Sequence, residues 1–210
     1  ASPPLAHDIQ SGVGYCLCGL GGASRSAGMF NDSMEYYRSA NSILSALHDR
    51  FGTAYSHCGI GNAFRMKGDY REARNYLKKA EILYKHIGDI VSYSYTLWSL
   101  GMTFLMSGNL SKAQLFFRMA GARFKKTKDI RGLIYCMLAS GQVHALNNNL
   151  PEANKLVMKA LTHSLQNCFT LEAGHAATLL YSMEHKSIKS AWYQTIGSRL
   201  KPTALPFNIP

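Results

Sequence analysis

The chain has 210 residues, of which 47% are hydrophobic and 17% are charged. Such an apolar composition excludes an intrinsically disordered chain, and this length allows one or two domains with a sizeable core. The 23 basic and 12 acidic residues give a formal net charge of +11, which favours acidic peptides, nucleic acid or anionic surfaces as partners.

A repeat with a period of 40 residues runs through the chain. Glycine recurs at positions 21, 61, 101 and 141, tyrosine at 15, 55, 95 and 135, and alanine at 40, 80, 120 and 160. Asp49, Asp89 and Asp129 have the same spacing. Regular columns of small and large residues are typical of stacked structural repeats, in which each unit packs on its neighbours.

Each repeat contains two runs of about 16 residues with apolar side chains at helical spacing, joined by a short turn, which predicts a helical hairpin. In chain order, we expect helices at residues 12–27, 31–47, 51–67, 70–86, 91–107, 110–127, 131–147, 150–166, 170–184 and 187–199. Residues 1–13 would be the end of a preceding repeat or a linker, and residues 14–184 a solenoid of repeats with one extra helix. Residues 185–200 would form a capping helix and residues 201–210 a tail.

The turn residues agree with this division. Glycine at 28, 68 and 108, and asparagine at 148, are expected to end the first helix of each hairpin in the left-handed conformation. Asp69, Asn109 and Asn149 are suited to cap the second helices, and the aspartates at 49, 89 and 129 to cap the first helix of the following repeat. The glycines at 21, 61, 101 and 141 would let the two helices of a hairpin approach closely.

The motif inside the second and third repeats is a large residue followed by glycine, then an aromatic residue, a turn glycine and alanines at fixed intervals, and the first and fourth repeats depart from it at Ser24, Ser33, Ser140, His144 and Asn148. The second repeat has Ile60-Gly61, Phe64, Gly68, Tyr70, Ala73, Leu77 and Ala80, and the third has Leu100-Gly101, Phe104, Gly108, Leu110, Ala113, Phe117 and Ala120. This pattern resembles the tetratricopeptide repeat (TPR) family, in a form with a longer period than the usual 34 residues. The resemblance covers residues 14–184 and implies an all-α fold, a right-handed α-solenoid of helix-turn-helix repeats, that acts as a non-enzymatic scaffold for protein-protein interaction.

In the TPR family the first helix of each hairpin lines a concave groove, so the resemblance implies a set of inward-facing residues that bind a peptide. They are Tyr15, Arg25, Tyr55, Asn62, Arg65, Tyr95, Trp98, Met102, Tyr135, Leu138 and Gln142. Asn62 matches a position at which family members hold a peptide backbone with an asparagine. For the tyrosine column two interpretations are open: packing between adjacent first helices, or contact with the ligand.

The two halves of this groove are expected to differ. Arg25, Asn62 and Arg65 make the first half polar and cationic, whereas the second half carries apolar side chains, namely Trp98, Met102, Leu105, Met106, Leu138 and Leu146. An apolar patch open to water usually marks a contact site, so we expect a protein or peptide partner with a hydrophobic end and an acidic end. The chain's own C-terminal segment, with Trp192 and Phe207, is a second candidate occupant, within the same chain or in a neighbouring copy. Burial of these apolar residues between repeats is the alternative to an open groove.

Six basic residues gather around the end of the helix predicted at 110–127. They are Arg118, Arg123, Lys125, Lys126, Lys128 and Arg131. Cations are favourable near a helix C-terminus, and the functional alternative is a patch that binds phosphate or an acidic partner. A basic regulatory or nucleic-acid-binding module is therefore the second hypothesis for function. A homo-oligomeric scaffold that assembles through its terminal repeats is the third.

The sequence has no phosphate-binding glycine loop, nucleophile elbow or His-Glu-x-x-His motif, so we predict a protein that is not an enzyme and uses neither cofactor nor metal. His57 and His144 replace large apolar residues of other repeats and are expected to pack in the core. The five cysteines lie in apolar, periodic segments, which predicts buried thiols in a reducing, cytoplasmic compartment. The uncharged stretch from Ile90 to Ser111 is long enough to span a bilayer. Because the same stretch of neighbouring repeats carries charges, we interpret it as a soluble helix.

Overall fold

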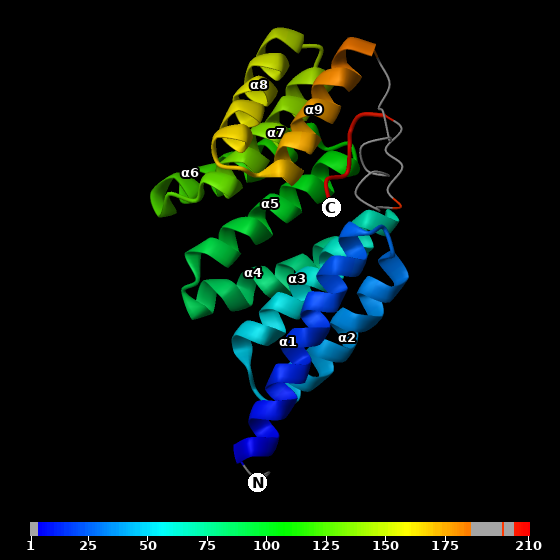
Figure 1. Ribbon diagram of the computed structural model, residues 1–210, viewed down its shortest axis with the longest axis vertical. Coiled ribbons are helices and arrows are strands. Elements are labelled where there is room, and N and C mark those ends of the chain that lie inside the picture. The colour runs from blue at the N-terminus through cyan, green and yellow to red at the C-terminus, as the bar shows by residue number, and fades with distance from the viewer. Residues whose placement is uncertain (1–3, 186–198, 200–203) are drawn as a thin grey trace. The chain divides into compact units, whose positions relative to one another are not determined.

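The computed structural model describes residues 4–185, 199 and 204–210 (Figure 1). Within those ranges it contains nine α-helices and no strand. The helices are α1 (Pro4–Ser26), α2 (Phe30–Ala46), α3 (Arg50–Lys67), α4 (Tyr70–Ile87), α5 (Ile90–Met106), α6 (Leu110–Thr127), α7 (Ile130–Leu146), α8 (Leu150–Gln166) and α9 (Thr170–His185). The predicted fold class, an all-helical protein built from repeated helix pairs, is confirmed.

The helix bounds agree closely with the expected ones, with one exception. Helix α1 begins at Pro4, well before the expected start at residue 12. Proline is tolerated in the first turn of a helix because its missing N–H has no intrahelical partner there. The helix predicted at 187–199, and with it the capping role of residues 185–200, lies outside the described residues apart from Arg199 and the end of α9.

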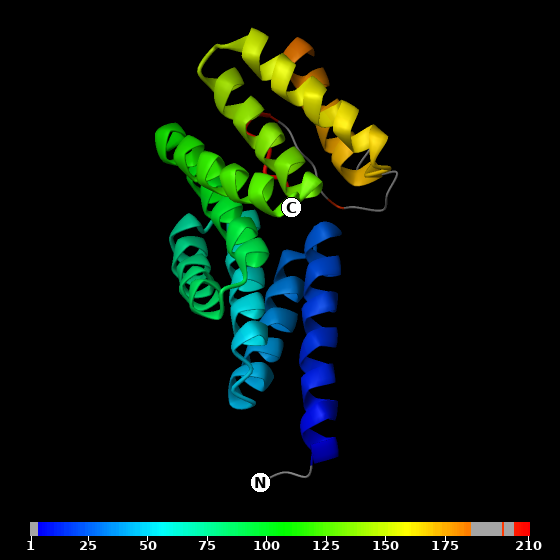
Figure 2. The same ribbon diagram turned by 90° about the vertical axis from the view of Figure 1, so that its left-hand side faces the viewer.

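The chain forms two compact units, one of residues 1–89 and 210 with α1–α4, and one of residues 90–209 with α5–α9. Within each unit, helices that follow one another in the chain pack side by side (Figures 1 and 2). The odd-numbered helices also contact one another, α1 with α3 in the first unit, and α5 with α7 and α7 with α9 in the second. We call these odd-numbered helices the inner helices, and the two parts of the chain unit 1 and unit 2.

A left-handed residue ends a helix every 20 positions. Positive φ angles occur at residues 28, 48, 68, 88, 108, 128, 148 and 168. Four of these are the three glycines and the asparagine that the sequence marks as turn residues, and a fifth is Gly88, which ends α4. The other three are His48, Lys128 and Cys168, with φ of 56–57°. Sequence analysis missed them because these residue types, unlike glycine and asparagine, rarely adopt this conformation, which costs them roughly 1–2 kcal/mol.

The expected helix caps are present at five positions. Asp69, Asn109 and Asn149 accept a hydrogen bond from the backbone N–H three residues later, at 3.1, 3.1 and 3.4 Å. Asp49 and Asp129 do the same at the start of the inner helices α3 and α7, both at 2.8 Å. Each of these bonds satisfies a backbone donor that the helix leaves open at its first turn.

The glycine column is a site of close helix packing, as predicted. A Cβ atom at position 21, 61, 101 or 141 would lie 2.5–2.7 Å from the side chain at position 37, 77, 117 or 157 of the following helix. Real Cβ atoms do not approach other atoms so closely. Glycine therefore allows each inner helix to lie against the large side chain of its hairpin partner.

Several burial predictions need correction. Only Cys18 and Cys136 are buried; Cys58 is half-buried, and Cys16 and Cys168 are exposed, the latter because it lies in the turn between α8 and α9. The histidines at 57 and 144 are half-buried at the edge of the core, whereas the histidine at 175 is fully buried. No helix among the described residues is long and apolar enough to cross a membrane.

Candidate functional site

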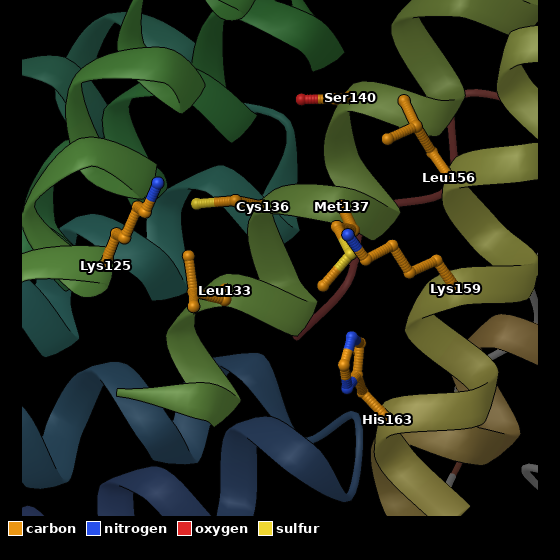
Figure 3. A pocket seen from close by; sticks show the side chains of 8 residues that line it. All are labelled: Lys125, Leu133, Cys136, Met137, Ser140, Leu156, Lys159 and His163. Carbon is orange, nitrogen blue, oxygen red and sulfur yellow. The ribbon is translucent and has the colours of Figure 1, made fainter. Parts of the chain in front are cut away.

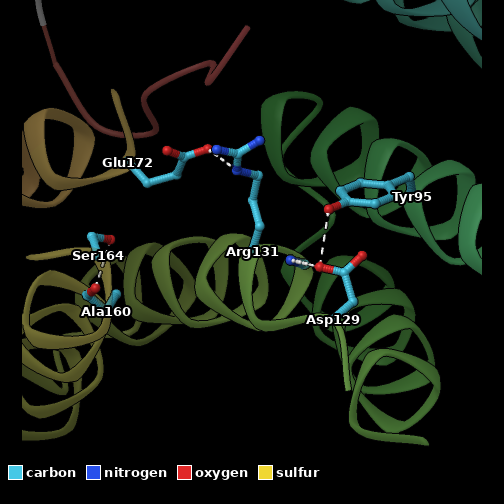
Figure 4. Close-up of polar contacts among 7 residues, drawn as sticks. Tyr95, Asp129, Arg131, Ala160, Ser164 and Glu172 are labelled. Atoms are coloured by element: carbon cyan, nitrogen blue, oxygen red, sulfur yellow. Dashed lines mark hydrogen bonds and ion pairs between the residues drawn. The ribbon is translucent and has the colours of Figure 1, made fainter. Parts of the chain in front are cut away.

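Tyr15 and Tyr95 of the tyrosine column connect consecutive inner helices. The Tyr15 hydroxyl donates a hydrogen bond to Asp49 Oδ2 at 2.7 Å, and the Tyr95 hydroxyl donates to Asp129 Oδ1 at 3.3 Å (Figure 4). Each aspartate also caps the inner helix of the next repeat, so one carboxylate joins two helices. Burial, together with the neighbouring aspartate, raises the pKa of both tyrosines above the ordinary value.

Glu172 replaces the missing aspartate of the last repeat. The column position after Asp129 is Phe169, and the carboxylate comes instead from the next turn of chain, in α9. Glu172 is 3% exposed and forms an ion pair with Arg131, with 3.1 Å between Glu172 Oε1 and Arg131 Nε (Figure 4). Burial, the charge of Glu172 and a hydrogen bond to it raise the pKa of Tyr135.

These contacts favour the packing interpretation for three tyrosines of the column. The hydroxyls of Tyr15, Tyr95 and Tyr135 all interact with carboxylates of the next repeat. Tyr55 differs, because its ring stacks on Phe51 with 6.3 Å between centroids and the residue is 42% exposed. Tyr55 is therefore the member of the column most accessible to a ligand.

The polar residues predicted to line the first half of the groove lie in unit 1, where two of them bond to each other. Arg65 is fully buried, and its Nε and Nη2 donate to Asn62 Oδ1 at 3.3 and 3.2 Å. Burial, and secondarily the charge of Arg25, lower the pKa of Arg65 to about 9. Asn62 is also buried. Its side-chain carbonyl accepts hydrogen bonds from Arg65 and is therefore not available to the backbone of a ligand. The expected cationic surface open to a ligand is thus wrong for Asn62 and Arg65, and only Arg25 is partly exposed.

Most of the apolar residues predicted to line the second half of the groove are buried in unit 2, whereas Met106 and Leu146 are half-buried. Trp98 is 6% exposed, and Met102 and Leu138 are 0% exposed. The indole Nε1 of Trp98 donates to the backbone oxygen of Tyr135 at 3.1 Å, and the two rings pack with 5.0 Å between centroids. Trp98 of α5 therefore packs directly against α7. The prediction of an apolar patch open to water is wrong, and burial is the correct alternative for these three residues.

The described C-terminal residues lie on the inner helices α7 and α9 of unit 2. The backbone N–H of Phe207 donates to Gln142 Oε1 on α7 at 2.5 Å, and the Phe207 ring lies 5.9 Å from the ring of His175 on α9. Phe207 is 4% exposed and Ile209 is 0% exposed. The C-terminal segment, proposed from the sequence as an occupant of this surface, is thus bound there through Phe207, whereas Trp192 lies outside the described residues.

His175 is a residue of this surface that sequence analysis did not single out. It follows Tyr135 by 40 residues and so occupies the tyrosine column of the extra repeat. Extending the column by one period would have found it. Burial lowers the pKa of His175 to about 3, so the imidazole is neutral where it meets Phe207.

The six basic residues expected as a patch are not equally available to a partner. Arg131 pairs with Glu172, and Arg123 Nη1 donates to the backbone oxygen of Met119 at 2.9 Å while its guanidinium lies over the Tyr93 ring. The remaining four are exposed side chains, namely Arg118, Lys125, Lys126 and Lys128. Two cations of the predicted patch therefore stabilise the fold.

A pocket of about 400 Å³ lies between α6, α7 and α8 in unit 2 (Figure 3). Its lining is largely apolar, with two lysines and one histidine among the residues Lys125, Leu133, Cys136, Met137, Ser140, Leu156, Lys159 and His163. This volume suits a small ligand. Burial raises the pKa of the Cys136 thiol to about 12, so this cysteine is a protonated, weakly reactive group.

No group of three histidine, cysteine or acidic residues in the described part of the chain is arranged to hold a metal ion. No protein-family model matches the chain, and no curated protein sequence matches it significantly. The case for a binding site on the inner surface of unit 2, at Gln142 and His175, therefore comes from its geometry alone.

Proposed function

We propose that the chain is a non-enzymatic scaffold of the tetratricopeptide repeat type that binds a segment of a partner protein on its inner helices. One observation carries the proposal: the inner surface of unit 2 holds a non-helical peptide segment, residues 204–209. Gln142 binds this segment through its main chain, and two of its apolar side chains are buried.

This arrangement has the features of a peptide-binding surface. A side-chain amide that bonds to a backbone N–H gives affinity without regard to sequence, whereas burial of alternate side chains gives specificity. Phe207 and Ile209 are the buried side chains, and Asn208 between them is half-buried. The surface therefore favours a partner segment with hydrophobic residues two positions apart, and the net charge of +11 favours acidic residues elsewhere in the partner.

Selection from a random peptide library displayed on phage, with the intact chain as bait, tests this function. We expect enriched peptides with an aromatic residue. Their affinity is compared in a chain that carries Phe207→Ala/Ile209→Ala, so that its own segment does not compete, and should be about tenfold lower when Gln142→Leu is added, because one main-chain hydrogen bond is lost. Gln114→Leu on α6, outside the inner surface, is the matched control and should leave the affinity of the same chain unchanged. Peptides that bind equally well with and without Gln142→Leu, or a library that yields no binder, would contradict the proposal.

A second candidate function is the binding of an anionic partner at the basic end of α6. The observation that favours it is the pocket of Figure 3, where Lys125 of α6 and Lys159 and His163 of α8 border one largely apolar lining. Binding of a single-stranded oligonucleotide that falls steeply with salt, and that is lost in Lys125→Ala, would support this function. Salt-independent binding of peptides alone would reject it.

A further inference from the structure

Residues 204–209 contact unit 2 in the manner of a bound ligand. The segment lies outside the helices, and the N–H of Phe207 donates a hydrogen bond to the side chain of Gln142. A short turn closed by a bond from the Ile209 N–H to the Phe207 carbonyl, at 3.1 Å, directs both apolar side chains into the protein. Recognition of a backbone atom and two side chains does not require that the segment belong to the same chain.

This segment satisfies only one of the two hydrogen-bonding groups of the Gln142 amide. The residue is 1% exposed, and its Oε1 accepts from Phe207, but its Nε2 has no hydrogen-bond partner among the described residues. A glutamine amide can donate and accept at once, so it can pair with both the N–H and the C=O of a peptide backbone. A buried donor without an acceptor is unfavourable. A ligand that offers a carbonyl to Nε2 would thus bind this surface better than the chain's own segment does.

We infer that residues 204–209 are an internal ligand that occupies the inner surface of unit 2 until a partner segment displaces it. This inference rests on the proposed function and specifies its ligand. The partner segment has an aromatic residue, a branched aliphatic residue two positions later, and a backbone that supplies both a donor and an acceptor to Gln142.

Because residues 204–209 are covalently joined to unit 2, they compete strongly with a partner segment for the inner surface. A segment joined to its own binding surface has an effective concentration on the order of millimolar, so even weak intrinsic binding fills the surface. A partner must overcome this competition, and its apparent affinity is lowered in proportion. Weakening the internal ligand should therefore strengthen the binding of any segment added from outside.

A fluorescent peptide with the sequence of residues 204–210 is the probe for this inference. It is titrated into the unaltered full chain, into Phe207→Ala/Ile209→Ala, and into Ala204→Ser, at an exposed residue of the same segment, as the matched control. We expect the double variant to bind the peptide about tenfold more tightly than the unaltered chain, and Ala204→Ser to bind like the unaltered chain. A peptide with N-methylated phenylalanine lacks the donor for Gln142 and should bind the double variant about tenfold more weakly.

Equal affinity of the unaltered chain and the folded double variant would overturn the inference while leaving the proposed function intact. Failure of the peptide to bind any variant would also overturn it, and the library selection then decides separately whether the surface binds other peptides. Should the double variant not fold, as judged by its melting transition, Phe207→Ala alone replaces it with the same expectations. A concentration-dependent dimer that Phe207→Ala dissociates would show that the segment binds a second copy, and this result rejects an internal ligand.

Discussion

Gln142 and Asn62 occupy the same column of the repeat, two periods apart, but their amides have different partners. In α3 the residue three positions later is Arg65, whose guanidinium bonds to Asn62 Oδ1. In α7 the equivalent position is Ala145, which leaves Gln142 to bind Phe207. Residues three apart face each other on a helix, so the sequence contains the signal for this difference.

The sequence therefore predicted the position of the site better than the residues that form it. The column of inward-facing residues was predicted correctly, and Gln142 was among the expected groove residues. Neighbouring residues that were expected to be open to a ligand are instead buried between repeats. Whether Trp98 faces solvent or the next inner helix depends on packing between repeats, which no single repeat encodes. The turn at Asn208 that places Phe207 and Ile209 depends on tertiary contacts for the same reason.

The buried imidazole of His175 predicts a loss of stability in acid. Its pKa is about 3 in the folded protein against 6.5 for the exposed group, so protonation favours the unfolded state. The stability it contributes is complete above about pH 6.5 and is lost as the pH falls from there towards about 3. We expect His175→Gln to show a smaller fall in melting temperature between about pH 7 and pH 5 than the unaltered chain.

His185→Gln is the matched control for this prediction, because His185 is exposed on the same helix. Its melting temperature should fall with pH as that of the unaltered chain does. An equal fall for His175→Gln would show that another group controls the acid sensitivity.

Two glycines of α1 test the packing role of the glycine column. A Cβ atom at Gly21 would lie 2.7 Å from the buried ring of Tyr37, whereas a Cβ atom at Gly19 would meet nothing within 4 Å. We expect Gly21→Ala to lower the free energy of unfolding by roughly 1–3 kcal/mol through overpacking. Gly19→Ala should raise it by roughly 0.5–1 kcal/mol, because alanine favours the helix. Urea unfolding of both variants measures the difference, and similar effects would show that the column has another cause.

At the scale of the helices, capping residues and turn glycines predicted most boundaries to within one or two residues. The helix predicted to start at residue 12 begins at Pro4, a residue type that is favoured in the first helical turn. The left-handed ends at His48, Lys128 and Cys168 were missed because their conformation is imposed by the 20-residue turn spacing and not by local preference.

The bond between tyrosine and aspartate should contribute measurably to the packing of inner helices. Tyr15→Phe removes the bond to Asp49 and should lower the free energy of unfolding by about 0.5–1.5 kcal/mol. Tyr55→Phe is the matched control, because Tyr55 stacks on Phe51 and this contact survives the change. The melting temperatures of both variants check the prediction, and a Tyr15→Phe variant as stable as the control would contradict it.

At the scale of the whole molecule, salt distinguishes the two candidate functions. Residues 204–210 carry no charged side chain, so binding of this peptide should change little between about 50 mM and 200 mM salt. A partner bound through six or more phosphates would lose about a thousandfold in affinity over the same range. Fluorescence titrations of the Phe207→Ala/Ile209→Ala variant at both salt concentrations make the comparison. A steep fall in peptide affinity would contradict an apolar, main-chain mode of binding.

Amide hydrogen exchange at Phe207 in the intact chain tests most directly whether the inner surface of unit 2 binds peptide segments through Gln142. The account predicts that the Phe207 N–H is protected in the unaltered chain and exchanges about tenfold faster in Gln142→Leu. It also predicts faster exchange in the unaltered chain when a saturating library-selected peptide displaces the segment. A Phe207 amide that exchanges at the rate of a free peptide in the unaltered chain, or that stays equally protected with the peptide bound, would contradict the account.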